Sequence, residues 1–101
     1  MTLAQHLAEM NAKTLAWVAE DPKNRWAGTL TEDLDHWAKM KVFTPYDLDL
    51  YLTLASYSDY YKDIHGCRPR MDWDVIDLAT AEKMMADLTA YADTLPKEFW
   101  D

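Results

Sequence analysis

Asp63, His65 and Cys67 lie within five residues of one another, and they are the side chains of this sequence that could do chemistry together. Carboxylate, imidazole and thiolate groups bind transition metals, and a cysteine beside a histidine could act as a nucleophile. A structural zinc site needs four ligands, however, and the other histidines, His6 and His36, belong to different predicted helices. The sequence therefore predicts no metal site, no catalytic residue and no cofactor.

The rest of the sequence also lacks a catalytic pattern. It holds two glycines, which are too few for a phosphate-binding loop, and it has no nucleophile-elbow pattern. Carboxylate pairs such as Asp72 and Asp74 are expected by chance in a chain with 18 acidic residues. We therefore expect a protein that is not an enzyme.

The composition predicts one small all-α domain. The 101 residues carry a formal net charge of −8, and half of them are hydrophobic. Five tryptophans and six tyrosines exclude an intrinsically disordered chain, and two glycines with four prolines are too few turn residues for a β-sandwich. A chain of this length can bury one core without disulfides. We expect a single helical domain over residues 1–101.

Apolar residues recur at helical spacing in four segments of the chain. Thr2 and Gln5 fit a capping box at the start of the first segment. Thr29 and Glu32 fit a second capping box at the start of the next segment. We predict four helices, over about residues 2–20, 30–41, 45–65 and 78–95.

The ends of the third and fourth helices also have sequence signals. Pro45 suits the first position of a helix, and Gly66 suits the left-handed position that follows a helix. The third helix carries apolar residues on more than one face, so we expect it to be central. Residues 71–77 alternate loosely and predict an extended connector, after which Asp77 or Thr80 can cap the last helix.

Several aromatic residues fall outside the helical stripes. We expect Trp26 to fasten the loop at residues 23–28 to the body of the protein. We expect Phe99 and Trp100 to fold back onto the core, and the alternative is that they are exposed as an interaction patch. These assignments leave the tyrosines of the third helix as the main aromatic candidates for binding.

The third predicted helix holds five tyrosines within sixteen residues, and they cannot all face one side. Tyr57 and Tyr61 lie on the apolar stripe, whereas Tyr46 and Tyr60 are expected to be exposed. Tyrosine is enriched in binding surfaces because its ring is large and rigid and has a polar tip. Interface and core roles remain open for these residues.

Residues 60–71 carry a local charge of +2 in an otherwise acidic chain, through Lys62, Arg68 and Arg70. The two arginines can pair with the protein's own carboxylates or bind a partner, and the sequence leaves both possibilities open. The acidic residues of the rest of the chain can serve solubility alone or bind a basic partner. Our candidate partner-binding residues are Tyr46, Asp47, Asp49, Asp59, Tyr60, Lys62, Arg68 and Arg70.

Bulk properties indicate a cytoplasmic protein. Cys67 is the single cysteine, so no internal disulfide can form, and the first residues lack the basic segment of an export signal. No run of about 18 apolar residues predicts a membrane span. A net charge of −8 repels phosphate backbones, so it disfavours nucleic acid as a partner and favours a protein with a basic surface.

Residues 58–70 have the pattern S-D-x-x-K-D-x-x-G-x-R-P-R, and residues 31–37 have the pattern T-E-D-L-x-x-W. Over residues 29–70 the chain resembles small helical accessory proteins of tailed bacteriophages and mobile elements, most of which have no assigned activity. Cys67 departs from the pattern, because a bulkier apolar or aromatic residue is expected there. The resemblance implies a phage accessory protein expressed in the bacterial host cytoplasm.

Proteins of that origin frequently act on host machinery, including restriction and CRISPR systems. We therefore expect a non-enzymatic protein that binds and inhibits a host protein with a basic surface, through acidic and tyrosine-rich helix surfaces. The alternative is a nucleic-acid-binding regulator that uses Lys62, Arg68 and Arg70.

Overall fold

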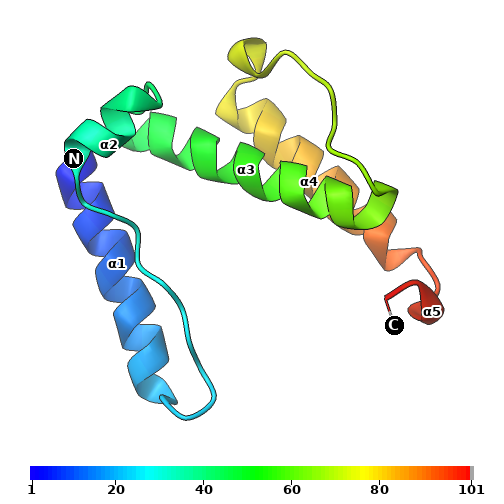
Figure 1. Cartoon of the computed structure of the whole chain (residues 1–101), viewed down its shortest axis with the longest axis horizontal. Helices are drawn as coiled ribbons and strands as arrows, with labels where there is room; N and C mark the ends of the chain where they lie inside the picture. The colour runs from blue at the N-terminus through cyan, green and yellow to red at the C-terminus, as the bar shows by residue number, and fades with distance from the viewer. Residues whose placement is uncertain (101) are drawn as a thin grey trace. The chain divides into compact units, whose positions relative to one another are not determined.

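A computed structural model describes residues 1–100, and all of its regular structure is helical, as the composition predicts (Figure 1). The chain forms two compact units, Met1–Leu48 and Asp49–Asp101, and the boundary between them lies within the third helix. The elements are α1 (Leu3–Glu20), α2 (Leu34–Lys39), α3 (Pro45–His65), a short 3₁₀ helix (Trp73–Val75), α4 (Leu78–Asp93) and α5 (Lys97–Trp100).

The start of α1 is the predicted capping box. The Gln5 backbone N–H donates to Thr2 Oγ1 at 3.1 Å, and the Thr2 backbone N–H donates to Gln5 Oε1 at 2.8 Å. The two side chains thus satisfy backbone donors that have no partner inside the helix. Leu3 and Leu7 are buried on the following turns, so the cap and the apolar stripe begin together.

Asn11 is the buried polar residue of α1, and it holds the segment that returns along the helix. Its Nδ2 donates to the Leu30 carbonyl oxygen at 2.8 Å and to Glu32 Oε2 at 3.2 Å, while its Oδ1 accepts from the Leu30 backbone N–H at 2.8 Å. Both backbone groups of Leu30 are thus bonded to Asn11, which holds this residue against α1 and outside a helical turn. The predicted start of a helix at residue 30 is therefore wrong.

The second helix begins four residues later, at Leu34. Its cap is Asp33, whose Oδ1 accepts from the Asp35 backbone N–H at 3.0 Å, and not Thr29 with Glu32. The indole of Trp37 is buried and donates from Nε1 to the Thr31 carbonyl oxygen at 2.7 Å. This bond ties the segment before α2 to the helix.

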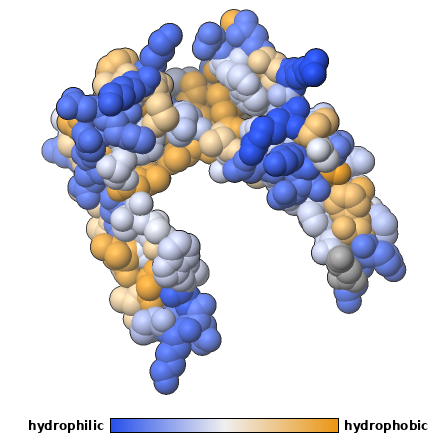
Figure 2. All heavy atoms as spheres, viewed as in Figure 1, coloured by the Kyte–Doolittle hydropathy of each residue, from blue (hydrophilic) through white to orange (hydrophobic). Residues whose placement is uncertain are grey.

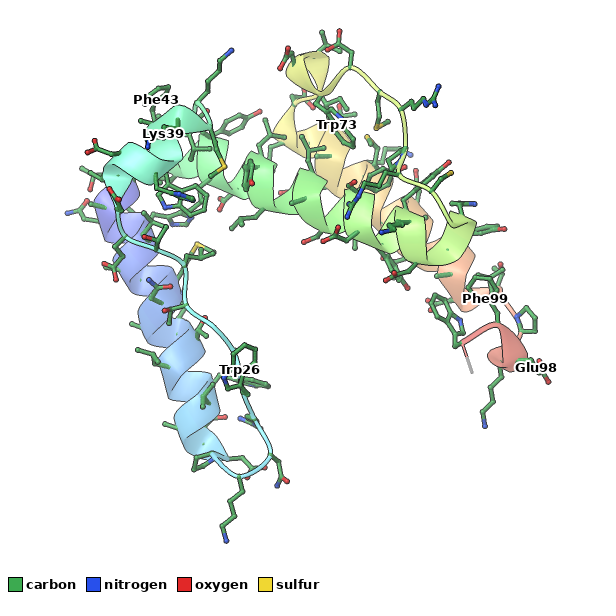
Figure 3. The ribbon with its side chains drawn as sticks, viewed as in Figure 1. Trp26, Lys39, Phe43, Trp73, Glu98 and Phe99 are labelled. Atoms are coloured by element: carbon green, nitrogen blue, oxygen red, sulfur yellow. The ribbon has the colours of Figure 1, made fainter. Side chains whose placement is uncertain are left out.

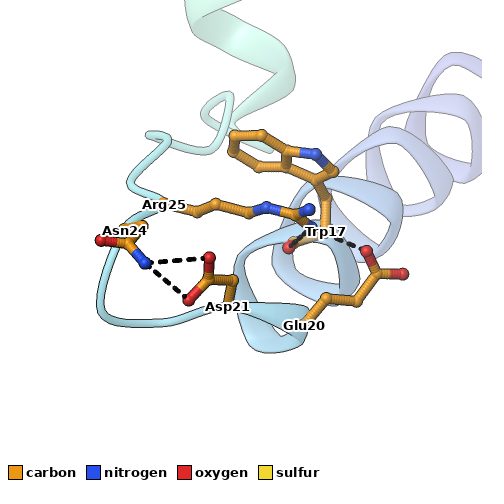
Figure 4. Close-up of polar contacts among 5 residues, drawn as sticks. All are labelled: Trp17, Glu20, Asp21, Asn24 and Arg25. Atoms are coloured by element: carbon orange, nitrogen blue, oxygen red, sulfur yellow. Dashed lines mark hydrogen bonds and ion pairs between the residues drawn. The ribbon is translucent and has the colours of Figure 1, made fainter.

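Trp26 does not fasten the loop after α1, because 86% of its surface is exposed (Figure 3). Arg25 has that role (Figure 4). Its Nη1 donates to the Trp17 carbonyl oxygen at 2.9 Å and to Glu20 Oε2 at 2.7 Å, and its guanidinium lies 4.8 Å from the centre of the Trp17 ring. The guanidinium thus caps a carbonyl at the end of α1 and stacks on the same residue.

Residues 12–20 of α1 contain no buried side chain. Leu15 is 58% exposed and Trp17 is 47% exposed, and Figure 2 shows hydrophobic residues at the surface along this helix. The buried apolar side chains of the first unit come instead from the first turns of α1, from α2 and the turn after it, and from the first turn of α3: Leu3, Leu7, Trp37, Val42 and Leu48.

The third helix ends as predicted and is followed by a turn that was not predicted. Gly66 has a φ of +79°, and its backbone N–H donates to the Lys62 carbonyl oxygen at 2.8 Å. Beyond it, Trp73–Val75 forms a 3₁₀ turn where we expected an extended connector, because Asp72 Oδ1 accepts from the Asp74 backbone N–H at 3.2 Å. That short aspartate side chain closes the turn.

The second unit is built on α3 and α4. Asp77 caps α4 by accepting from the Thr80 backbone N–H at 2.7 Å, which decides between the two predicted caps. Ile64 of α3 and Leu88 and Ala92 of α4 form its buried cluster. Half-buried residues pack against that cluster: Tyr57, Tyr60, Tyr61 and Leu95.

Candidate functional site

Three of the candidate residues lie at the beginning of α3: Tyr46, Asp47 and Asp49. Asp47 stabilises the start of this helix. Its Oδ2 accepts from the backbone N–H groups of Phe43 at 3.0 Å and Thr44 at 3.2 Å, and its own backbone N–H donates to Thr44 Oγ1 at 3.1 Å. The helix thus starts where Pro45 predicts, with the Thr44 hydroxyl as its cap and the Asp47 carboxylate at its third position. Tyr46 is 49% exposed, and Asp49 is half-buried.

The structure brings Asp59 and Arg68 together. Arg68 Nη1 lies 2.6 Å from Asp59 Oδ1 and donates to Ser58 Oγ at 3.0 Å. This contact ties the chain after Gly66 back to α3. Of the two possibilities that the sequence left open for Arg68, the structure shows pairing with a carboxylate of the protein itself. Both side chains are more than half exposed, and such pairs contribute at most about 1 kcal/mol. Lys62 and Arg70 are exposed.

Tyr60 is half-buried instead of exposed, because it packs against the Ile64 cluster. Its ring also stacks on Trp100, with centroids 6.2 Å apart and an interplanar angle of 23°. Phe99 lies edge-on to Trp100 at 5.0 Å. The terminal aromatic residues thus fold back onto α3 as expected, although each keeps nearly half of its surface exposed.

Cys67 is an exposed free thiol. Within residues 1–100, no group of three or more histidine, cysteine, aspartate or glutamate side chains could hold a metal ion. His65 is instead placed among aromatic rings, 4.3 Å from the Tyr61 centroid and 5.8 Å from the Tyr91 centroid. Its ring is nearly parallel to that of Tyr91, at 16°.

These rings form part of a groove of about 330 Å³ between α3 and α4, which we call the aromatic groove. One side comes from the last turns of α3 and the other from the middle of α4, and Leu88 of the buried cluster forms part of the lining. Its lining residues are Tyr57, Tyr61, His65, Met84, Asp87, Leu88 and Tyr91.

Two titratable groups in and beside the aromatic groove have shifted pKa values. Burial, and then the nearby Tyr61, raise the pKa of Tyr57 above its ordinary value of 10.0. On the groove's edge, Lys83 Nζ lies 2.8 Å from Asp87 Oδ2, and this hydrogen bond and charge raise the pKa of Lys83. Asp87 thus places a carboxylate on a wall that is otherwise mainly aromatic and apolar.

Sequence reasoning missed this groove because helical periodicity identifies a face but not how deeply its residues are covered. Tyr57 and Tyr61 lie on the predicted apolar stripe of α3, and the apolar spacing of α4 includes Met84 and Tyr91, which are seven residues apart. The first three are half-buried and Tyr91 is 48% exposed, so the stripes form the sides of an open groove and not a closed core. The sequence signals that could have indicated the groove were His65 at the end of the α3 stripe and Asp87 beside the α4 stripe.

A second hollow of about 280 Å³ lies between α3 and the 3₁₀ turn. Trp73 reaches from that turn toward α3 (Figure 3). Ser58, which also accepts the bond from Arg68, lies in the lining. The lining is mainly apolar and consists of Tyr51, Leu54, Ala55, Ser58 and Trp73.

Comparison with protein-family models, with curated proteins and with solved structures gives no match to this chain. Among the helices of residues 1–100, none combines the length and the apolar character that are needed to cross a bilayer.

Proposed function

We propose that this protein is a non-enzymatic bacteriophage accessory protein that binds and inhibits a host protein through acidic, tyrosine-rich helix surfaces. The proposed target is a nucleic-acid-handling defence complex with a basic surface, which makes the protein an inhibitor of the anti-CRISPR or anti-restriction type. The phage origin rests on the resemblance of residues 58–70, and the choice of target is an analogy with proteins of that origin.

The observation that carries the binding proposal is that aromatic rings and carboxylates reach the surface on the same helices of the second unit. Tyr51, Tyr91 and Trp100 are exposed, and the carboxylates of Asp59 and Asp87 are exposed as well. Rigid aromatic rings with polar tips contribute a large share of the energy at protein interfaces. An exposed set of this kind supports binding to another protein.

The charge supports a basic partner. Residues 49–101 contain 11 acidic residues against 5 lysines and arginines, so most of the net charge of −8 lies in this half of the chain. A surface of one sign accelerates encounter with the opposite sign and disfavours partners of its own sign. The pairing of Arg68 with Asp59 also reduces the positive charge with which residues 60–71 could bind a nucleic acid.

Two charge-matched variants test this proposal. The first, Asp49→Asn with Asp59→Asn, removes two candidate carboxylates, and the amide at residue 59 can still accept from Arg68. The second, Glu9→Gln with Asp35→Asn, removes two exposed carboxylates of the first unit. Both variants carry the same net charge, so any difference between them reports position and not total charge.

The three proteins are expressed in bacterial strains that carry defined CRISPR or restriction systems, and phage plating is measured. We expect the unmodified protein and the second variant to restore plating and to retain one host protein stoichiometrically. The first variant should weaken that association about tenfold or more if the complex desolvates both carboxylates. Absence of inhibition and of a stoichiometric partner across the panel contradicts the proposal.

Binding to nucleic acid is tested in parallel. If the purified protein binds duplex or single-stranded nucleic acid, with an affinity that falls as salt rises and that Lys62→Ala and Arg70→Ala abolish, the protein is instead a nucleic-acid-binding regulator.

A further inference from the structure

The aromatic groove combines two features that together select a cation. Tyr57, Tyr61 and Tyr91 present aromatic rings, whose faces carry negative electrostatic potential. Asp87 adds a formal negative charge to the same lining. Neither feature alone defines a ligand, but an aromatic wall with a carboxylate beside it is complementary to a positive charge on a flat or compact group.

The ion pair between Lys83 and Asp87 leaves room for a second cation. Lys83 contacts Oδ2 of the carboxylate, and a carboxylate can accept several hydrogen bonds through its two oxygens. Both side chains of this pair are about two-thirds exposed or more, so the pair contributes little and can rearrange when a ligand arrives.

The shape of the groove favours a guanidinium over an ammonium group. His65 and Tyr91 lie nearly parallel, at 16° with their centroids 5.8 Å apart, so the lining includes planar aromatic groups in a similar orientation. A guanidinium is planar, stacks on aromatic faces and binds carboxylates through two parallel hydrogen bonds. The chain already contains one such contact, because Arg25 lies 4.8 Å from the Trp17 ring centre while it binds Glu20.

We propose that the aromatic groove binds an arginine side chain of a basic partner protein, with the guanidinium against the tyrosine rings and paired with Asp87. This inference rests on the proposed function, since it names the chemistry by which a basic partner is recognised. It also adds a site that lies outside the candidate residues of the sequence.

The probe is Nα-acetyl-arginine amide, which carries a single positive charge, titrated into the uniformly ¹⁵N-labelled full chain at constant ionic strength. We expect chemical-shift changes to concentrate on the residues that line the aromatic groove. Nα-acetyl-citrulline amide has nearly the same shape without the charge, and it should give no such changes. Equal binding of citrulline, or arginine-induced shifts spread over all acidic segments, overturns the proposal.

Two variants and their matched controls locate the contact. Tyr91→Leu keeps apolar bulk and removes the ring, and Asp87→Asn keeps the shape and removes the charge; each should weaken arginine binding about two- to fivefold. Tyr51→Leu replaces a tyrosine that is also partly exposed, at 38% against 48% for Tyr91, and Asp93→Asn removes another carboxylate of α4. These controls should change the affinity by less than twofold, and an equal loss in the controls contradicts the site.

Two further results separate this inference from the proposed function. If Nα-acetyl-lysine amide binds the groove more tightly than the arginine probe, the choice of guanidinium is wrong. If the host protein is retained and inhibited but neither probe binds the groove, the proposed function stands and this inference fails.

Discussion

At the scale of single residues, Asn11 joins α1 to a segment that lies 19 residues further along the chain. Changing Asn11 to Ala leaves the backbone N–H and carbonyl of Leu30, both partly buried, without their partners. Unsatisfied groups of this kind cost about 1–3 kcal/mol, so the free energy of unfolding should fall by that amount in urea denaturation. Asn24→Ala is the control, because the Asn24 side chain is exposed and bonds to the nearby Asp21 in the same turn. An equal loss in both variants contradicts the assignment.

Tyr57 gives the protein a pH dependence on the alkaline side. Burial raises its pKa in the folded state above the ordinary 10.0, so the unfolded chain releases this proton at lower pH than the folded protein does. The stability is therefore complete below about pH 10 and declines as the pH rises through the higher folded pKa. Tyr57→Phe should decline less over that range in parallel thermal melts. Because the lysines titrate equally in both proteins, identical declines contradict this effect of Tyr57.

At the scale of elements, the end of α2 is strained at one residue. The backbone N–H of Val42 donates to the Trp37 carbonyl at 2.9 Å and that of Lys41 to the Ala38 carbonyl at 3.0 Å, which together form a Schellman motif. Lys41 occupies its left-handed position with a φ of +60°. Lys41→Gly should raise the free energy of unfolding by about 0.5–1 kcal/mol, after the greater freedom of unfolded glycine is counted. A decrease in urea denaturation contradicts this account.

At the end of α3 the left-handed position is already occupied by a glycine, so the opposite substitution can be tested there. Gly66 has a φ of +79°, and a Cβ added there meets no atom within 4 Å, so any cost of Gly66→Ala comes from the backbone conformation alone. We expect the free energy of unfolding to fall by about 1 kcal/mol. Gly66→Asn should cost less, because asparagine adopts the left-handed region more readily. If alanine and asparagine cost the same, the conformation of this residue is not the cause.

Some helix ends could be predicted from the sequence, and others could not. The starts of α1, α3 and α4 follow local rules within a few residues: the sequence predicts the cap at Thr2 and the first helical position at Pro45, and it offers Asp77 or Thr80 as the cap of α4. The start of α2 depends on Asn11 and Leu30, which are 19 residues apart, and no local signal contains that contact. The aromatic groove escaped prediction for a related reason, since it depends on how closely α3 and α4 approach and not on the spacing of residues within either helix.

At the scale of the whole molecule, the excess of acidic residues acts on folding and on binding in opposite directions. The net charge of −8 makes the folded chain repel itself, and added salt screens that repulsion. Salt also weakens exposed ion pairs such as Lys13 with Glu9, but each of these contributes at most about 1 kcal/mol. The melting temperature should therefore rise as sodium chloride is added.

Binding to a basic partner should respond to the same salt in the opposite sense. Attraction between an acidic and a basic surface is screened once the ionic strength exceeds about 0.1 M, where the Debye length is about 10 Å, so the association rate with the host protein should fall as salt is added. Because the protein becomes more stable over that range, unfolding cannot account for slower association. Association that is insensitive to salt, measured beside a rising melting temperature, shows that the carboxylates serve solubility and that the aromatic residues alone contact the partner.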